Sequence, residues 1–249
     1  MDQRICLQHR SLGQEGTETK GISKNNHKKR AGNFKKRQRV FVKPPRHLSI
    51  LMQSPILPVE EHPLEPFLPA NAKLLMLGSF PPQKKRWSMD FFYPNLQNDM
   101  WRIFGLIFFS NKDHFLFPDK KAFDKERLVE FLTEKGIALY DTASSVRRLQ
   151  DNASDKFLEV VEPTDIRLLL KQLPQCKAIV TTGQKATDII REQVEAKEPK
   201  VGESEPFHFE DKELRLYRMP SSSRAYPLSI EKKASAYRLM LNELGITPQ

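Results

Sequence analysis

The chain has 249 residues, with 41 Lys and Arg against 31 Asp and Glu, and a net charge of +10 at pH 7. Its two cysteines, Cys6 and Cys176, exclude a four-cysteine zinc site or iron–sulfur cluster and favour a reducing compartment. No apolar run is long enough to span a bilayer, and residues 1–30 lack the apolar stretch of a secretory signal. We therefore expect a protein of the bacterial cytoplasm or nucleoid, without a membrane partner.

The net positive charge of the chain comes from residues 1–50. This segment holds 13 of the 41 basic residues and three of the 31 acidic ones, which leaves 28 of each sign in the remainder. We expect it to be a disordered basic tail. It is either an electrostatic arm that holds nucleic acid loosely or a dispensable extension before a true start at Met52. Residues 51–72 are rich in proline and are expected to form an extended lead-in to a single domain over residues 73–249.

Within this domain, predicted strands alternate with predicted helices. Short apolar runs predict strands at 74–77, 137–140, 177–181 and 214–218. Periodic apolar positions predict helices at 99–109, 127–135, 165–172, 184–194 and 230–244. Thr164 is the expected N-cap of the third helix and Gly136 the expected C-cap of the second, whereas 141–156 and 195–211 are expected to be mostly loop. The alternation predicts an α/β fold, a three-layer α/β/α arrangement around a central four-stranded parallel sheet.

Polar or Gly/Pro-containing loops follow all four predicted strands. Their sequences are GSFPP at 78–82, DTASS at 141–145, TTGQK at 181–185 and PSSSR at 220–224. Because the carboxyl ends of parallel strands meet at one edge of a sheet, we expect these loops to converge on one crevice.

Several common sites are absent from the sequence. The chain has no G-x-G-x-x-G fingerprint, no Walker A pattern and no G-x-S-x-G elbow. Three of the six histidines lie in the basic tail, and none has metal-ligand spacing. We therefore expect no cofactor, no metal and no histidine general base in the crevice.

Three sequence blocks resemble a known family. They are LLMLGSFPP with FFYPNLQNDMW at 74–82 and 91–101, ALYDTASSVRRLQDNASD at 138–155, and MPSSSRAY at 219–226. These blocks resemble the uracil-DNA glycosylase superfamily, and more specifically its hypoxanthine-DNA glycosylase-like branch, over residues 66–244. The resemblance implies a monomeric, monofunctional glycosylase of base-excision repair. Its partner would be DNA that contains damaged or deaminated bases, uracil or hypoxanthine, and it would need no cofactor.

The resemblance implies that Asn98 is the catalytic residue. Many members of the superfamily place a water-activating Asp or Asn two residues after the motif glycine, where this chain has Phe80. The hypoxanthine branch shares this departure and relies on an Asn three residues before a Trp, which corresponds to Asn98 and Trp101 here. Because an amide has no proton that titrates near neutral pH, we expect Asn98 to orient water through its carbonyl oxygen. It is also a candidate N-cap for the helix at 99–109.

The resemblance also implies a base pocket and DNA contacts. The expected base pocket contains Gly78, Ser79, Phe80, Phe92, Tyr93 and Thr182, with Phe92 or Tyr93 stacking on the base. The expected DNA-binding residues are Arg147, Arg148, Ser221, Ser222, Ser223, Arg224 and Tyr226. Arg224 or Tyr226 would fill the gap left by the flipped base, and Asp141 would sit near the sugar or order its loop.

Two departures leave alternatives open. Phe80 cannot activate water, and Thr182 stands near where relatives often carry a base-reading Asn. A single hydroxyl cannot make the bidentate contact of an amide. The alternative to an enzyme is a catalytically inactive nucleic-acid-binding protein of the same fold. A third alternative is a hydrolase of small nucleosides or nucleotides.

Overall fold

The computed structural model describes residues 57–150 and 155–248. The basic tail predicted for residues 1–50, and the first part of the lead-in, lie outside the described residues. None of the helices in the described ranges combines the length and apolarity needed to cross a membrane.

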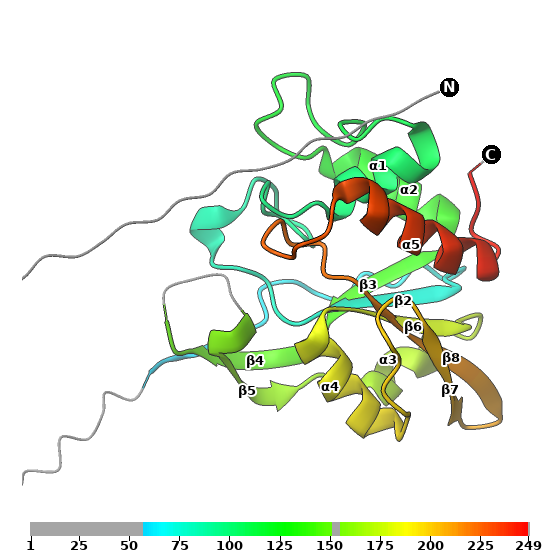
Figure 1. Cartoon of the computed structure of the whole chain (residues 1–249). Coiled ribbons are helices and arrows are strands. Elements are labelled where there is room, and N and C mark those ends of the chain that lie inside the picture. The colour runs from blue at the N-terminus through cyan, green and yellow to red at the C-terminus, as the bar shows by residue number, and fades with distance from the viewer. Residues whose placement is uncertain (1–56, 151–154, 249) are drawn as a thin grey trace, which may run out of the picture. The chain divides into compact units, whose positions relative to one another are not determined.

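A five-stranded sheet forms the centre of the domain, as Figure 1 shows. Its strands, in spatial order, are β3 (Ile137–Asp141), β2 (Leu74–Gly78), β6 (Ala178–Thr182), β8 (Lys212–Met219) and β7 (Ser204–Phe209). The first four strands are parallel, as predicted, whereas β7 pairs antiparallel with β8. Residues 195–211, which include β7, were expected to be mostly loop. In β7 the buried Phe207 and Phe209 alternate with Ser204, Pro206 and His208, which is too weak a strand pattern to recognise in sequence.

Helices cover both faces of this sheet (Figure 1). Helices α1 (Met100–Phe109), α2 (Lys125–Lys135) and α5 (Ile230–Glu243) share one apolar cluster, which includes Leu74 and Met76 of β2. Helices α3 (Ile166–Lys171) and α4 (Gln184–Val194) share the other, which includes Leu75 and Leu77. Alternate residues of β2 therefore face opposite cores, as expected for a central parallel strand buried on both faces.

A second, smaller sheet corrects the prediction that residues 141–156 are mostly loop. It consists of β1 (Val59–Glu61), β4 (Ala143–Arg148) and β5 (Leu158–Pro163), all antiparallel, and a 3₁₀ turn, η2 (Asp155–Phe157), precedes β5. Ala143, Val146 and Leu158 pack together against Phe80. Strand β4 has few apolar residues, but β1 and β5 pair with both of its edges, and the Phe80 ring packs against its buried side chains.

The predicted helix ends are confirmed at Gly136 and corrected at Thr164. Gly136 ends α2 with φ of 66°. The N-cap of α3 is Asp165, whose carboxylate accepts from the amides of Arg167 and Leu168. Thr164 instead donates its hydroxyl to the carbonyl oxygen of Asp141, at 2.8 Å. This hydrogen bond from Thr164 connects the end of β5 to the end of β3.

Candidate active site

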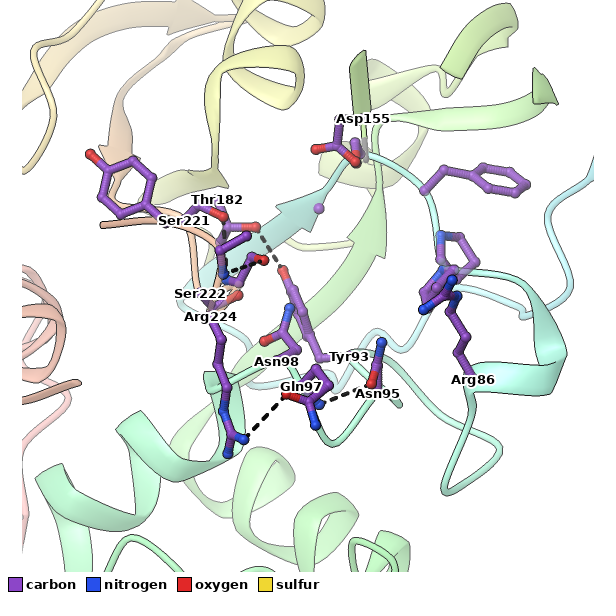
Figure 2. A pocket seen from close by; sticks show the side chains of 18 of the residues that line it. Arg86, Tyr93, Asn95, Gln97, Asn98, Asp155, Thr182, Ser221, Ser222 and Arg224 are labelled. Carbon is purple, nitrogen blue, oxygen red and sulfur yellow. Dashed lines mark hydrogen bonds between the residues drawn. The ribbon is translucent and has the colours of Figure 1, made fainter. Parts of the chain in front are cut away.

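A crevice of about 770 Å³ opens at the carboxyl edge of the four parallel strands. It is lined by Gly78 at the end of β2, Asp141 at the end of β3, Thr182 at the end of β6 and Ser222 after β8. The predicted convergence of four loops on one crevice therefore agrees with the geometry. The 3₁₀ turn η1 (Lys84–Arg86) and residues 93–98 form the opposite rim, and several of these side chains appear in Figure 2.

Gly78 leaves room for the carboxylate of Asp141. A Cβ atom at position 78 would overlap Asp141 Oδ1, and the Tyr93 hydroxyl would lie 3.6 Å from it. The amide of Thr142 donates to the carbonyl oxygen of Gly78 at 2.9 Å, which fixes the ends of β2 and β3 side by side. The glycine therefore allows a carboxylate and a phenol to approach the backbone at the crevice floor.

Tyr93 reaches into the crevice, and Phe92 does not. The hydroxyl of Tyr93 lies 3.2 Å from Thr182 Oγ1, the contact drawn in Figure 2. Its backbone has φ of 48°, which is uncommon for a large side chain, and such strained backbone clusters at functional sites. Burial raises the pKa of Tyr93 well above its usual range, and the nearby Asp141 raises it further. The phenol therefore stays neutral and acts as a hydrogen-bonding group.

Phe92 belongs to the core. Its ring is buried against Phe91, with centroids 5.2 Å apart, and its carbonyl oxygen accepts from Trp101 Nε1 at 3.0 Å. Of the two predicted stacking residues, the geometry therefore leaves Tyr93 as the candidate. Phe80 lines the crevice, but its ring is mostly buried and packs edge-on against His62.

Asn98 lines the crevice directly beside the serine loop, residues 221–223. It forms an antiparallel bridge with Ser223, and the next amide, of Asp99, donates to the carbonyl oxygen of Ser222 at 2.8 Å. The side-chain oxygen of Asn98 accepts from the amide of Met100 at 2.9 Å. The N-cap of α1 is Asp99, not Asn98, and the side-chain oxygen of Asn98 closes the turn before the helix instead. One lone pair of the oxygen predicted to orient water is therefore already used.

Helix α5 holds the serine loop in place. Lys233 is 1% exposed, and its ammonium donates to the carbonyl oxygen of Ser223 at 2.8 Å. Tyr237 donates to the carbonyl oxygen of Pro220 at 3.0 Å. Within the loop, the hydroxyl oxygens of Ser221 and Ser223 accept from the amides two residues further on. These contacts fix a loop that has no regular secondary structure.

The predicted cations do not all face the crevice. Arg224 lines it, with its Nε 2.8 Å from Asp99 Oδ1, and Tyr226 lies nearby in the same loop. The guanidinium of Arg148 is nearly buried, donates to Glu60 at 2.9 Å and to the carbonyl oxygen of Pro81 at 2.6 Å, and so stabilises the loop after β2. Arg147 lies outside the crevice, next to Glu159. The two arginines of β4 are therefore not placed as free phosphate contacts.

Two further groups at the crevice were not identified from the sequence. His62 Nε2 lies 3.0 Å from Asp141 Oδ2, behind the crevice floor, although the two residues are 79 positions apart. Asp155 lines the crevice itself and lies within 141–156, the segment expected to be mostly loop. Both depend on long-range contacts that no local pattern indicates. In the described residues, no group of three or more His, Cys, Asp or Glu side chains is arranged to hold a metal ion.

Comparisons with known proteins support the fold. No protein-family model and no curated protein matches the chain. Among solved structures, the chain is similar to the NMR structure of a proposed uracil DNA glycosylase from Methanosarcina acetivorans. The two are 19% identical with a TM-score of 0.51, over 75% of this chain and 99% of the other. The mixed α/β fold, with parallel strands in a central sheet flanked by helices, is therefore shared with that structure.

Proposed function

We propose that this chain is a monofunctional DNA glycosylase that removes a deaminated base, uracil or hypoxanthine, in base-excision repair. The observation that carries the proposal is the crevice that brings Gly78, Tyr93, Asn98 and Ser222 together at the carboxyl edge of the sheet. Cavities of roughly 300–1,000 Å³ hold small ligands, and a flipped nucleotide is of that class. The shared fold adds support, because the similar structure is described as a proposed uracil DNA glycosylase.

The proposed substrate position follows from the chemistry of the crevice walls. A base cannot be cleaved inside a stacked duplex, so the target nucleotide must be flipped out. The ring of Tyr93 would stack on the flipped base, and backbone amides at 78–80 would hold its carbonyl oxygen. The hydroxyls of Ser221 and Ser223 would bind the flanking phosphates, with Arg224 or Tyr226 in the gap left in the duplex.

The proposed reaction is hydrolysis of the bond between the base and the deoxyribose. This bond breaks through an oxocarbenium-like state that needs only a weak nucleophile. Most of the rate enhancement would come from groups fixed around the leaving base and the sugar. Asn98 would position water with the remaining lone pair of its side-chain oxygen, whose orientation is fixed by the amide of Met100.

The finer proposals concern which base is excised, which branch of the superfamily the chain resembles, and where in the cell the protein acts. The Tyr93–Thr182 hydroxyl pair would read one edge of the base in place of the Asn found in relatives. The match of the 91–101 block favours the hypoxanthine-DNA glycosylase-like branch. In this role the protein would act as a monomer in the cytoplasm or nucleoid.

The alternative of a binding protein without activity is favoured by two observations. Phe80 occupies the usual water-activating position, and the side-chain oxygen of Asn98 already accepts from the amide of Met100. A protein of this kind would retain the crevice and bind DNA, but it would not cleave the glycosidic bond.

The test is an excision assay on defined duplexes. The protein is incubated with duplexes that contain a single uracil, hypoxanthine or mismatch, and alkali then cleaves any abasic site. We expect strand scission at uracil or hypoxanthine and none in the undamaged duplex. The absence of scission in every duplex, with DNA binding intact, would reject the enzyme in favour of the binding protein.

A further inference from the structure

Asp155 places a carboxylate in the crevice that the proposed function leaves without a role. It opens the turn η2 and lines the same cavity as Gly78, Ser79 and Phe80. Ser79 forms a hydrogen bond with this carboxylate. Because Ser79 immediately precedes Phe80, Asp155 lies close to the position at which many members of the superfamily carry the water-activating residue. In Figure 2 it lies on the side of the crevice away from Gln97 and Arg224.

Asp141, the other carboxylate of the crevice, is already committed. One of its oxygens lies 3.0 Å from His62 Nε2, and the other lies against the backbone of Gly78. Its side chain is only 9% exposed. Within residues 57–150 and 155–248, the side-chain hydrogen bond of Asp155 comes from the Ser79 hydroxyl, which leaves lone pairs of the carboxylate for a molecule in the crevice.

The charged groups around Asp155 come from several elements. Asp141 and Tyr93 face it from the crevice floor, Lys185 from α4 and Arg148 from β4. Lys185 donates to the carbonyl oxygen of Leu158, and Arg148 is held by Glu60 and Pro81, so both cations are engaged elsewhere. Burial raises the pKa of Asp155, and Asp141 raises it further, whereas Ser79 and the two cations oppose the rise. A carboxylate with a raised pKa is the stronger proton acceptor.

We propose that Asp155 supplies the catalytic carboxylate that position 80 lacks, and that it accepts the proton of the attacking water. This inference rests on the proposed function. The chain would thus provide, from the segment before β5, a group that many members of the superfamily place two residues after the motif glycine.

The step balances without any further reactant. The bond between C1′ and the base nitrogen breaks, and its electron pair leaves with the base. The water oxygen forms the new bond to C1′, and the proton that it loses passes to Asp155. The departing base takes a proton from solvent, and Asp155 returns its proton to solvent, so that one water is consumed.

The test compares Asp155→Asn with Asp211→Asn, which removes an exposed carboxylate in the turn between β7 and β8. Single-turnover excision is measured on the duplex that the unaltered protein cleaves fastest. Binding is measured with a duplex carrying the non-cleavable 2′-fluoroarabino nucleotide. Loss of a general base typically costs about 10²–10⁴-fold in rate, so we expect Asp155→Asn to lose at least about 100-fold with binding unchanged within about threefold. Asp211→Asn should match the unaltered protein.

The dependence of the excision rate on pH is a second measurement. It uses the unaltered protein, so it does not require that any variant folds. The excision rate should rise from acid towards neutral pH, with a midpoint above the ordinary pKa of an aspartic acid. A rate independent of pH over that range would overturn the role of Asp155. Full activity of a folded Asp155→Asn would also overturn it and leave the glycosylase intact. No excision by the unaltered protein on any duplex would reject the proposed function, and this inference with it.

Discussion

His62 Nε2 lies 3.0 Å from Asp141 Oδ2, and the side chains are 2% and 9% exposed. This contact joins the segment after β1 to the end of β3, where Asp141 lies against Gly78 at the floor of the crevice. The ring also packs against Tyr140, with centroids 4.6 Å apart, and its Nδ1 lies 2.8 Å from the carbonyl oxygen of Leu64. His62 therefore positions a crevice carboxylate without lining the crevice.

Replacing this histidine should destabilise the domain. His62→Ala leaves the buried carboxylate of Asp141 without its hydrogen-bond partner, and an unsatisfied buried polar group costs about 1–3 kcal/mol. Urea unfolding followed by circular dichroism measures the loss. His208→Ala is the matched control, because that side chain is 78% exposed and should change stability by less than about 0.5 kcal/mol. Equal stability of the two variants would show that the pair contributes nothing.

Lys233 offers a test of how α5 supports the serine loop. Lys233→Met keeps the length of the buried side chain but removes the donor to the carbonyl oxygen of Ser223. An unpaired buried carbonyl costs about 1–3 kcal/mol, and the loop can recover part of this only by moving. We expect roughly tenfold weaker binding of damaged duplex, measured by fluorescence anisotropy. Lys232→Met, one residue earlier on the exposed side of α5, should bind within about twofold of the unaltered protein.

The raised pKa of Asp155 also predicts that the stability of the domain depends on pH. Burial raises its pKa in the folded protein above the unfolded value, so the protonated acid is the form that folding favours. This contribution is fully present below the unfolded pKa of the group and is lost as the pH rises through the folded pKa. Asp155→Asn should therefore unfold at higher urea than the unaltered protein at neutral pH, and the advantage should shrink towards acid pH. An advantage that grew towards acid would give the opposite sign and contradict the burial argument.

Two variants can separate the contribution of the Tyr93 ring to DNA binding from that of its hydroxyl. Tyr93→Leu removes the stacking surface, which is worth about 1–3 kcal/mol for each stacked base. Tyr93→Phe keeps the ring and loses only the contact with Thr182. We expect the leucine variant to bind the non-cleavable duplex about tenfold or more weakly, and the phenylalanine variant to retain most of the affinity. Equal losses in both would assign the effect to the hydroxyl pair instead of stacking.

The parts of the site that sequence could predict are those that follow a strand directly. Gly78, Thr182 and Ser222 lie at or just beyond the carboxyl ends of strands that apolar runs reveal, and parallel pairing then brings them together. Tyr93 and Asn98 were identified through their block of sequence. Strand β7 was missed because it is an edge strand whose outward residues are polar.

The parts that sequence could not predict depend on contacts between distant residues. Arg148 pairs with Glu60 across 88 positions and donates to the carbonyl oxygen of Pro81, so a cation expected to contact phosphate stabilises β1 and the loop after β2 instead. Phe92 and Tyr93 are neighbours in sequence, but the left-handed backbone at Tyr93 directs only the second ring into the crevice. No periodicity or spacing encodes these choices, because they are decided by packing.

Asn98 has two functions that a pair of variants can separate. Its side-chain oxygen closes the turn before α1 by accepting from the amide of Met100, and it is also the residue proposed to orient the water. Asn98→Ala removes both and should lose about 1 kcal/mol of stability, the usual net worth of one hydrogen bond. Asn98→Ser restores an acceptor oxygen on a shorter side chain, so it should recover most of that stability but not the excision rate. Urea unfolding and single-turnover excision on the same two proteins measure the two effects. Recovery of both by serine would mean that Asn98 acts only through its bond to Met100, and excision unchanged in both variants would remove Asn98 from the mechanism.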